Sequence, residues 1–360
     1  MARPAQVRLS AAALQHNLER VRSYAPEAKV MAVVKANGYG HGLEWAARVL
    51  SQADAFGVAS VEEGTTLRRA GVTRPVCLLE GFFRNEELAL LVAERLSTVV
   101  HHERQIRDLE DFSGSAPVDV WLKIDTGMHR IGFDPQRAAS AASRLRACKS
   151  VGALGLLSHF ANADNKFDSA TSFQIGLFND LAASIGGERS LANSAGIVAW
   201  PESRLEWVRP GIMLYGVSPM IGQGGIELGL EPVMTLSSEI IAISRRRKGE
   251  AIGYGGDWVC PEEMPVGVVA IGYGDGYPRH VPAGTPVLVN GRRVPLVGRV
   301  SMDMITVDLR DQPGARIGDP AVLWGAGLPV EEIAARAGTI GYELLCQVTP
   351  RAPRIESAER

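Results

Sequence analysis

A lone lysine stands at the end of a run of small and β-branched residues in the segment AVVKANGYGHG, residues 32–42. Lys35 closes that run, and Gly38, Gly40 and Gly42 follow it in a predicted turn. Burying an ammonium group is costly unless the group is paired or neutralised. The amine of Lys35 is therefore expected either to extend to solvent or to take part in chemistry, such as formation of a Schiff base with a carbonyl compound.

Two later segments suit the binding of an anion. LANSAG, residues 191–196, offers a serine hydroxyl at a possible helix N-terminus, and RPGIMLYG, residues 209–216, offers glycine backbone N–H groups. Each feature alone is common, since a strand-end lysine usually extends to solvent and such a serine usually only caps a helix. Together, a lysine opposite a phosphate cradle indicates a Schiff base to a phosphorylated aldehyde, for which pyridoxal 5'-phosphate is the obvious candidate.

The elements that must position these residues alternate along the first part of the chain, where short apolar runs are separated by segments of helical length. The predicted strands are Val30–Val34, Ala55–Ala59, Val76–Leu79, Ser97–Val100, Val118–Ile124, Val151–Ser158, Arg189–Asn193 and Ile212–Tyr215. This alternation predicts an α/β fold, and it favours a (β/α)8 TIM barrel over an open doubly wound sheet. Because the carboxyl ends of barrel strands share one edge, Lys35 and both anion-binding segments are expected there.

The pattern changes after a glycine- and proline-rich stretch at residues 216–232. Beyond it, strand-like runs are bounded by turns, and Asn290-Gly291 between two apolar runs is a strong hairpin signal. We expect a cofactor-binding barrel domain over residues 1–230. A mostly-β C-terminal domain over residues 231–360 is expected to follow, with one short helix at about residues 330–337.

The overall composition limits the possible partners and location. The net charge of −2 over 360 residues gives no reason to expect nucleic acid or a membrane surface as a partner. The N-terminus has no apolar segment of signal-peptide length, and no run approaches a membrane span. The four cysteines are far apart, which fits neither a disulfide framework nor a zinc site, so no metal and a cytoplasmic location are expected.

Eight motifs taken together resemble the alanine racemase family, in the expected order and over essentially the whole chain. They are AVVKANGYGHG, WLKIDTGMHRIGF, SHFANAD, WVRPGIMLYG, IGYGGDW, AIGYGDGYPR, GRVSMDM and GYELLC. The resemblance implies a pyridoxal-phosphate enzyme of fold type III. It also implies a homodimer in which each active site is shared between the two subunits.

The resemblance implies that Lys35 and Tyr254 are the two catalytic bases. Lys35 would hold the cofactor and act on one face of the substrate α-carbon, while Tyr254 of the other subunit would act on the opposite face. One base alone would tend to return the proton to the face that it left. Because a tyrosine with a pKa of about 10 is a poor base at neutral pH, it needs help from its surroundings, and His159 matches the histidine that the family uses.

Further positions match binding residues of the family. Arg209 would contact the pyridine nitrogen, and because arginine stays protonated, the ring would be a weaker electron sink than one paired with a carboxylate. Arg130 would lie beside the cofactor hydroxyl and the substrate carboxylate, and Lys123 matches a lysine that many family members carry in carbamylated form to orient that arginine. The phosphate-binding set is Tyr39, Ser194, Gly211, Ile212 and Tyr342. Met302 and Asp303 match contacts to the substrate carboxylate, and Tyr273 matches a residue that narrows substrate access.

Some residues have simpler interpretations when the resemblance is set aside. Tyr342 would be a packing residue that opens a strand, YELLC, and Tyr273 would be a packing aromatic. His16, His101, His102 and His280 are assigned to the class of satisfied core histidines. In the glycine-rich turn, many family members have alanine where this chain has Gly38, which changes no functional group.

The predicted activity is interconversion of L- and D-alanine, supplying D-alanine for peptidoglycan or serving alanine catabolism. A pyridoxal-phosphate decarboxylase of basic amino acids is the first alternative, although Arg209 and Tyr254 argue against it. A broad-specificity racemase is a closer alternative: such enzymes usually carry an export signal, which this sequence is not expected to have, and the breadth of substrates depends on the size of the pocket. A non-catalytic carrier of the cofactor would lack the C-terminal β domain.

Overall fold

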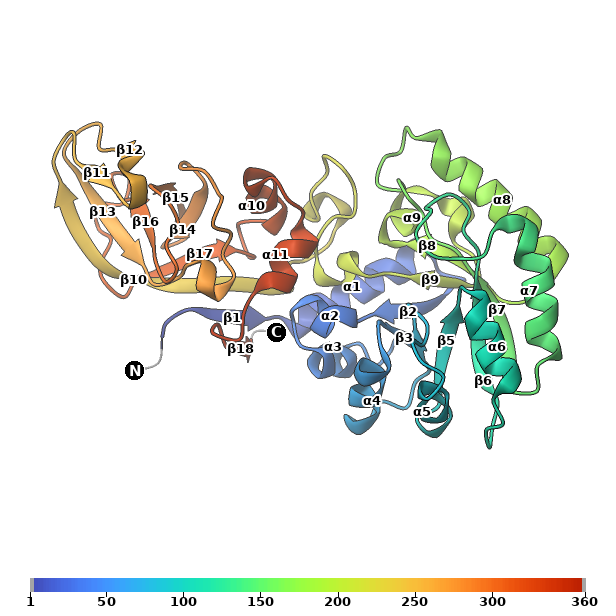
Figure 1. Cartoon of the computed structure of the whole chain (residues 1–360). Helices are drawn as coiled ribbons and strands as arrows, with labels where there is room; N and C mark the ends of the chain where they lie inside the picture. The colour runs from blue at the N-terminus through green and yellow to red at the C-terminus, as the bar shows by residue number, and fades with distance from the viewer. Residues whose placement is uncertain (1–2, 358–360) are drawn as a thin grey trace.

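The computed structural model describes residues 3–357, which form two lobes joined by the segment around residues 216–232 (Figure 1). Eight parallel strands close into a barrel in chain order. They are β2 (Lys29–Val33), β3 (Ala55–Val58), β4 (Val76–Leu78), β5 (Leu96–Val100), β6 (Val118–Lys123), β7 (Val151–Leu157), β8 (Arg189–Asn193) and β9 (Trp207–Arg209). The predicted fold class, a (β/α)8 barrel followed by a mostly-β domain, is confirmed.

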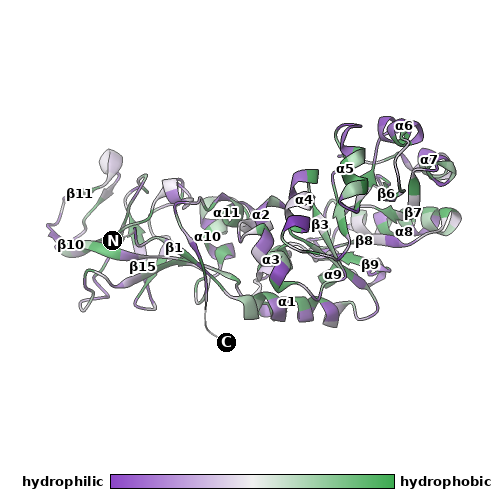
Figure 2. Cartoon of the chain, turned by 90° about the horizontal axis from the view of Figure 1, so that it is seen from below, coloured by the Kyte–Doolittle hydropathy of each residue, from purple (hydrophilic) through white to green (hydrophobic). Residues whose placement is uncertain are grey.

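Helices surround the barrel strands and present polar residues to solvent. They are α1 (Ala11–Tyr24), α2 (Lys35–Tyr39), α3 (Leu43–Val49), α4 (Val61–Arg69), α5 (Glu87–Ala93), α6 (Glu103–Asp111), α7 (Pro135–Ala147), α8 (Ser169–Ile185), α9 (Ser194–Ala199) and the short η1 (Pro201–Ser203). Ser10 caps α1, since its Oγ accepts a hydrogen bond of 3.1 Å from the N–H of Ala13. Figure 2 shows α6 as largely hydrophilic, as expected for an outer helix that buries only one stripe.

The eighth strand differs from the prediction, which placed it at residues 212–215. That segment is the 3-10 helix η2 (Ile212–Tyr215), and the strand is β9, which ends at Arg209. All four residues of η2 are buried, and the hydroxyl of Tyr215 donates to the carbonyl oxygen of Val33 at 3.1 Å. A short, fully apolar run does not by itself distinguish a strand from a buried helical turn. Because β9 ends at Arg209, the second anion-binding segment still leaves the carboxyl end of a barrel strand.

The second lobe is built on antiparallel strands. They are β10 (Met234–Arg246), β11 (Ala251–Ile252), β12 (Trp258–Val259), β13 (Met264–Val269), β14 (Pro286–Val289), β15 (Arg292–Val297), β16 (Ile305–Asp308) and β17 (Pro320–Trp324), with β1 (Gln6–Leu9) and β18 (Arg354–Glu356) beside them. β14 and β15 form the predicted hairpin, in which Asn290 and Gly291 both have positive φ. The long β10 pairs with β13, β17 and β1 and runs along the whole lobe (Figure 1).

The first and the last strands of the described residues both lie in this second sheet. β1 pairs antiparallel with β10 and parallel with β18, so Gln6–Leu9 belongs in space to the β lobe although it precedes the barrel in the chain. The predicted boundary at residue 230 therefore divides the sequence into two segments, and it remains a prediction.

Short helical segments complete the second lobe. They are η3 (Ile226–Leu228), η4 (Tyr254–Gly256), η5 (Tyr273–Asp275), α10 (Val330–Ala337) and α11 (Gly341–Gln347). α10 is the predicted helix, whereas α11 replaces the predicted strand YELLC. Among the helices of residues 3–357, none combines the length and apolar character that a membrane crossing requires.

Candidate active site

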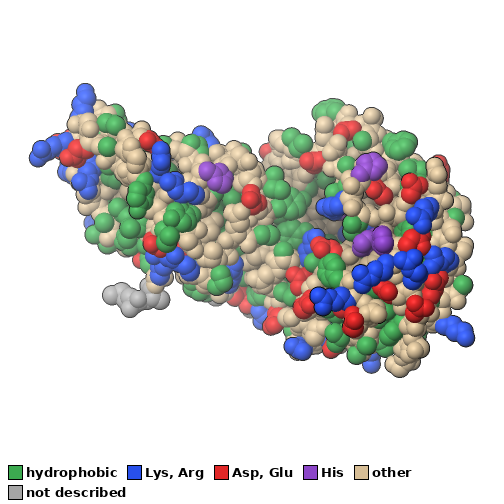
Figure 3. Space-filling model, in the orientation of Figure 1, with side chains coloured by type: hydrophobic (Ala, Val, Ile, Leu, Met, Phe, Trp, Pro, Cys, Tyr) green, Lys and Arg blue, Asp and Glu red, His purple; other side chains and the backbone are tan. Residues whose placement is uncertain are grey.

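Ten of the predicted residues line one cavity of about 810 Å³ at the carboxyl end of the barrel. They are Lys35, Tyr39, Lys123, Arg130, His159, Ser194, Arg209, Gly211, Ile212 and Tyr342. On the face drawn in Figure 3, the surface is hollowed between the lobes, with lysine or arginine side chains at the edge of the hollow. Residues far apart in the sequence therefore meet in one place.

Lys35 is followed by an unusual turn of left-handed helix. The φ angles are 54° at Ala36, 54° at Asn37, 61° at Gly38 and 51° at Tyr39. A non-glycine residue pays roughly 1–2 kcal/mol in this region. Such a strained conformation persists only where contacts from the surrounding structure hold the backbone in place, and it occurs most often at functional sites.

The turn is packed against the second lobe. Gly40 has φ 81°, and a Cβ there would overlap the carbonyl oxygen of Leu345 in α11, so only glycine permits this approach. The same contact brings Tyr342 of α11 to the cavity, where its ring centroid lies 6.1 Å from that of Tyr39. The C-terminal lobe thus supplies one wall of the barrel's cavity.

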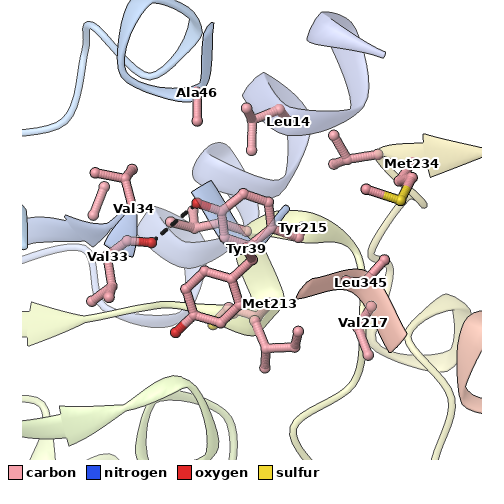
Figure 4. Packing of buried hydrophobic residues seen from close by; sticks show 14 of the residues in the cluster. Leu14, Val33, Val34, Tyr39, Ala46, Met213, Tyr215, Val217, Met234 and Leu345 are labelled. Atoms are coloured by element: carbon pink, nitrogen blue, oxygen red, sulfur yellow. Dashed lines mark hydrogen bonds between the residues drawn. The ribbon is translucent and has the colours of Figure 1, made fainter. Parts of the chain in front are cut away.

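Tyr39 packs against other aromatic rings, and Figure 4 shows its ring beside that of Tyr215. The rings of Tyr39 and Tyr215 stack with their centroids 4.8 Å apart. The ring centroid of His41 lies 4.6 Å from that of Tyr215. Burial lowers the pKa of His41 to about 4, so the imidazole is neutral at pH 7. Its Nδ1 lies 3.0 Å from the carbonyl oxygen of Gly38 and 2.9 Å from that of Tyr39, so Nδ1 carries the hydrogen and donates to them.

Hydroxyl and backbone N–H groups converge at the ends of β8 and β9. The Oγ of Ser194 accepts hydrogen bonds from the N–H of Gly211 at 2.9 Å and of Met213 at 3.4 Å. A Cβ on Gly211 would overlap the Tyr39 hydroxyl, so that hydroxyl reaches close to the same backbone. Burial raises the pKa of Tyr39 and of Tyr342, which keeps both hydroxyls protonated and able to donate to an anion.

The cavity gathers cationic side chains. The Nζ of Lys35 lies 3.5 Å from a carboxylate oxygen of Glu80. Burial, and after it the charges of Arg209 and Arg130, lowers the pKa of Lys123 to about 8. Burial and the same cationic neighbours lower the pKa of His159 well below its usual range, so its imidazole is neutral at pH 7. An anionic ligand would relieve this excess of positive charge.

Arg209 is held rigidly beneath the cavity. Its Nη1 donates to the Oγ of Ser190 at 2.5 Å, and its Nη2 donates to the carbonyl oxygens of Ser158 at 2.5 Å and Leu191 at 3.3 Å. Burial lowers its pKa to about 10, which leaves the guanidinium charged at neutral pH. The side chain therefore offers a fixed cation that cannot accept a proton.

Four predicted residues of the second lobe do not line this cavity. They are Tyr254, Tyr273, Met302 and Asp303. Tyr254 has an exposed fraction of 67%, Met302 of 52% and Tyr273 of 40%.

Several residues of the cavity were missed or misjudged from the sequence. Glu80, Phe82 and Cys346 line it, and so do His101 and His102. The assignment of His102 and His280 to a core is wrong, since both side chains are exposed. His101 faces the cavity, and its Nε2 lies 3.1 Å from the carbonyl oxygen of Glu80. A signal was available for all of these residues except Cys346, which lies in α11, because Glu80 and Phe82 follow β4 and the two histidines follow β5 at the same edge as Lys35.

Comparison with known proteins gives one consistent result. The sequence profile described as the alanine racemase N-terminal domain matches residues 9–219, and the profile for the C-terminal domain matches residues 233–356. The chain belongs to the alanine racemase family. The alanine racemase of Nitrosococcus oceani is 57% identical over 350 residues, which cover 97% of this chain and 98% of that protein. The alanine racemase of Vibrio cholerae is 55% identical over 94% of each chain.

Solved structures agree with the alanine racemase assignment. The crystal structure of the biosynthetic alanine racemase from Pseudomonas aeruginosa matches with a TM-score of 0.96 and 44% identity, over 99% of each chain. The alanine racemase from Acinetobacter baumannii matches with a TM-score of 0.94 and 37% identity, over 99% of this chain and all of that one. The family and the isomerase class predicted from the sequence are confirmed.

Proposed function

We propose that this protein interconverts L- and D-alanine with pyridoxal 5'-phosphate, as a dimer. The observation that carries the proposal is one cationic cavity that holds Lys35 together with the cradle of Ser194, Gly211 and Tyr39. D-alanine so formed would serve peptidoglycan synthesis, or the reaction would serve alanine catabolism. A cytoplasmic location is consistent with the four cysteines, which are all free.

The residues present fit the proposed cofactor. The hydroxyls of Tyr39, Ser194 and Tyr342 and the backbone at Gly211 and Ile212 would hold its phosphate, because all five residues line one cavity and the Tyr39 hydroxyl lies so close to Gly211 that a Cβ there would overlap it. When bound, the cofactor supplies an aldehyde that condenses with an amine and a ring that withdraws electrons from the substrate α-carbon. Lys35 would hold the aldehyde, and Arg209, fixed and charged, would face the ring nitrogen.

Two bases on opposite faces are proposed to move the α-proton. The Nζ of Lys35 would take or give it on one face, and the Oη of the partner subunit's Tyr254 on the other. Tyr254 is exposed and outside its own chain's cavity, which supports a role in a second subunit. His159, neutral because of burial and its cationic neighbours, can accept a hydrogen bond from that hydroxyl. Tyr273, Met302 and Asp303 would border the substrate's carboxylate and its route of access.

Lys123 is proposed to carry a carbamate that orients Arg130 toward the substrate carboxylate. The uncharged amine attacks the carbon of carbon dioxide and loses a proton, which leaves one negative charge between cations. Because the folded pKa of about 8 is below the ordinary value of a lysine, the reactive amine is more abundant near neutral pH than for a free lysine. Carbon-13 NMR in labelled bicarbonate should show a carbamate signal that falls as the pH falls.

The signal should be lost in Lys123→Ala and kept in Lys149→Ala, whose lysine is exposed at the opposite end of the barrel. A signal that persists in Lys123→Ala would show that the carbamate lies elsewhere.

Isotope exchange distinguishes the proposed racemase from a decarboxylase. Incubation with L-alanine in heavy water should give both enantiomers labelled at the α-carbon, because each base exchanges its proton with solvent. The assay should be run in parallel with serine, lysine and arginine, since the pocket size sets the substrate range. Chiral chromatography with mass detection measures the outcome, and release of carbon dioxide without D-alanine would contradict the proposal.

A further inference from the structure

The left-handed turn after Lys35 is anchored at its far end by several groups. Besides the contact of His41 with two carbonyl oxygens, Arg354 donates to the carbonyl oxygen of Gly40 from Nε at 3.1 Å and Nη2 at 2.9 Å. The side-chain oxygen of Asn37 accepts from the N–H of Leu43 at 3.0 Å. These bonds fix the end of the turn that carries Tyr39, but they do not reach the peptide next to Lys35.

The near end of the turn is held by a carboxylate from another helix. Oε1 of Glu63 accepts a hydrogen bond of 2.8 Å from the N–H of Ala36, the residue directly after Lys35. Oε2 of the same carboxylate accepts a hydrogen bond of 2.8 Å from the N–H of Ala59, the residue directly after β3. One side chain thus bridges the ends of two neighbouring barrel strands.

Glu63 is itself well placed to be rigid. It lies in the first turn of α4, where the N-cap residue Ser60 accepts a hydrogen bond of 3.5 Å at its Oγ from the backbone N–H of Glu63. Val61 and Leu67 bury the inner face of the helix, and Gly64 packs against Leu96 of β5. A carboxylate that accepts two backbone N–H groups makes stronger hydrogen bonds than a neutral acceptor.

We propose that Glu63 is a positioning residue for Lys35. By holding the peptide unit between Lys35 and Ala36, its carboxylate fixes the direction in which the lysine leaves the strained turn and thus where Nζ meets the substrate. The inference rests on the proposed role of Lys35 as the lysine that holds the cofactor. It predicts that losing the carboxylate lowers kcat while the phosphate cradle and the KM for alanine stay nearly unchanged.

The test compares Glu63→Ala, Glu63→Gln and a matched control, Glu62→Ala, in the full-length protein with cofactor. Glu62 lies in the same turn of α4, and its side chain is exposed. Glu63→Ala should raise amide hydrogen exchange at Ala36 and Ala59 about tenfold or more and lower kcat by a similar factor, because a charge-assisted hydrogen bond is lost at each site. Glu63→Gln keeps one acceptor oxygen and should show smaller effects of the same kind.

Thermal unfolding of each variant separates positioning from loss of the fold. If Glu63→Ala does not fold, Glu63→Gln decides, since it keeps the shape of the side chain. Unchanged exchange at both amides, or faster exchange with kcat unchanged, would overturn the inference. Should Lys35→Ala keep both its bound cofactor and its activity, the proposed role of Lys35 fails instead, and the exchange data would still report whether Glu63 holds the turn.

Discussion

Replacing Lys35 by alanine is expected to lower alanine racemisation by about 10⁴-fold or more, because covalent attachment and one general base are lost together. The variant should also lose bound pyridoxal phosphate during gel filtration, since only non-covalent contacts to the cofactor remain. The visible absorbance of the eluted protein and chiral chromatography of the products measure the two effects. The fold should persist, because Lys35 is partly exposed and forms its ion pair with Glu80, which is itself partly exposed at the cavity.

Lys149→Ala is the matched control for Lys35→Ala. Lys149 is exposed at the turn before β7, at the other end of the barrel, and its loss should change neither absorbance nor rate. If Lys35→Ala kept both the absorbance and the activity, another amine would hold the cofactor and the proposed site would be wrong.

Replacing Tyr254 by phenylalanine is expected to lower racemisation by roughly 10²–10⁴-fold while the bound cofactor is retained, because only one proton-transfer group is removed. In heavy water, the remaining base should still exchange the α-proton of one enantiomer without inverting it. Following deuterium incorporation separately from L-alanine and D-alanine measures this asymmetry. Tyr24→Phe, on α1 at the outside of the barrel, controls for loss of a tyrosine hydroxyl.

Mixing the two variants tests whether the active site is shared. In a hybrid dimer of Lys35→Ala and Tyr254→Phe chains, one site combines the intact Lys35 of one chain with the intact Tyr254 of the other. Random assembly should therefore restore about one quarter of the wild-type rate. Hybrids that stay inactive, or Tyr254→Phe that racemises at the normal rate in both directions, would contradict the proposed second base.

Much of the site was predictable from the sequence because it depends on local chemistry at strand ends. Lys35 closes an apolar run, Ser194 begins a helix after β8, and Gly211 follows β9, so parallel strands bring all three to one edge. The same rule would have found Glu80 and His101, which follow β4 and β5. They were missed because, taken one at a time, a glutamate or a histidine has many ordinary roles.

The sequence by itself determined the α/β barrel, the β-rich second lobe and the residue types that converge on the cavity, because hydrophobic periodicity and turn residues act over short stretches. Only the tertiary structure decided that Trp207–Arg209 is the eighth strand and that YELLC is a helix, because burial alone does not select a backbone conformation. It also decided that the turn after Lys35 is left-handed. That conformation is unfavourable for Ala36, Asn37 and Tyr39 alone. It is held by His41 at the end of the same segment, and by Glu63 and Arg354, which come from two other parts of the chain.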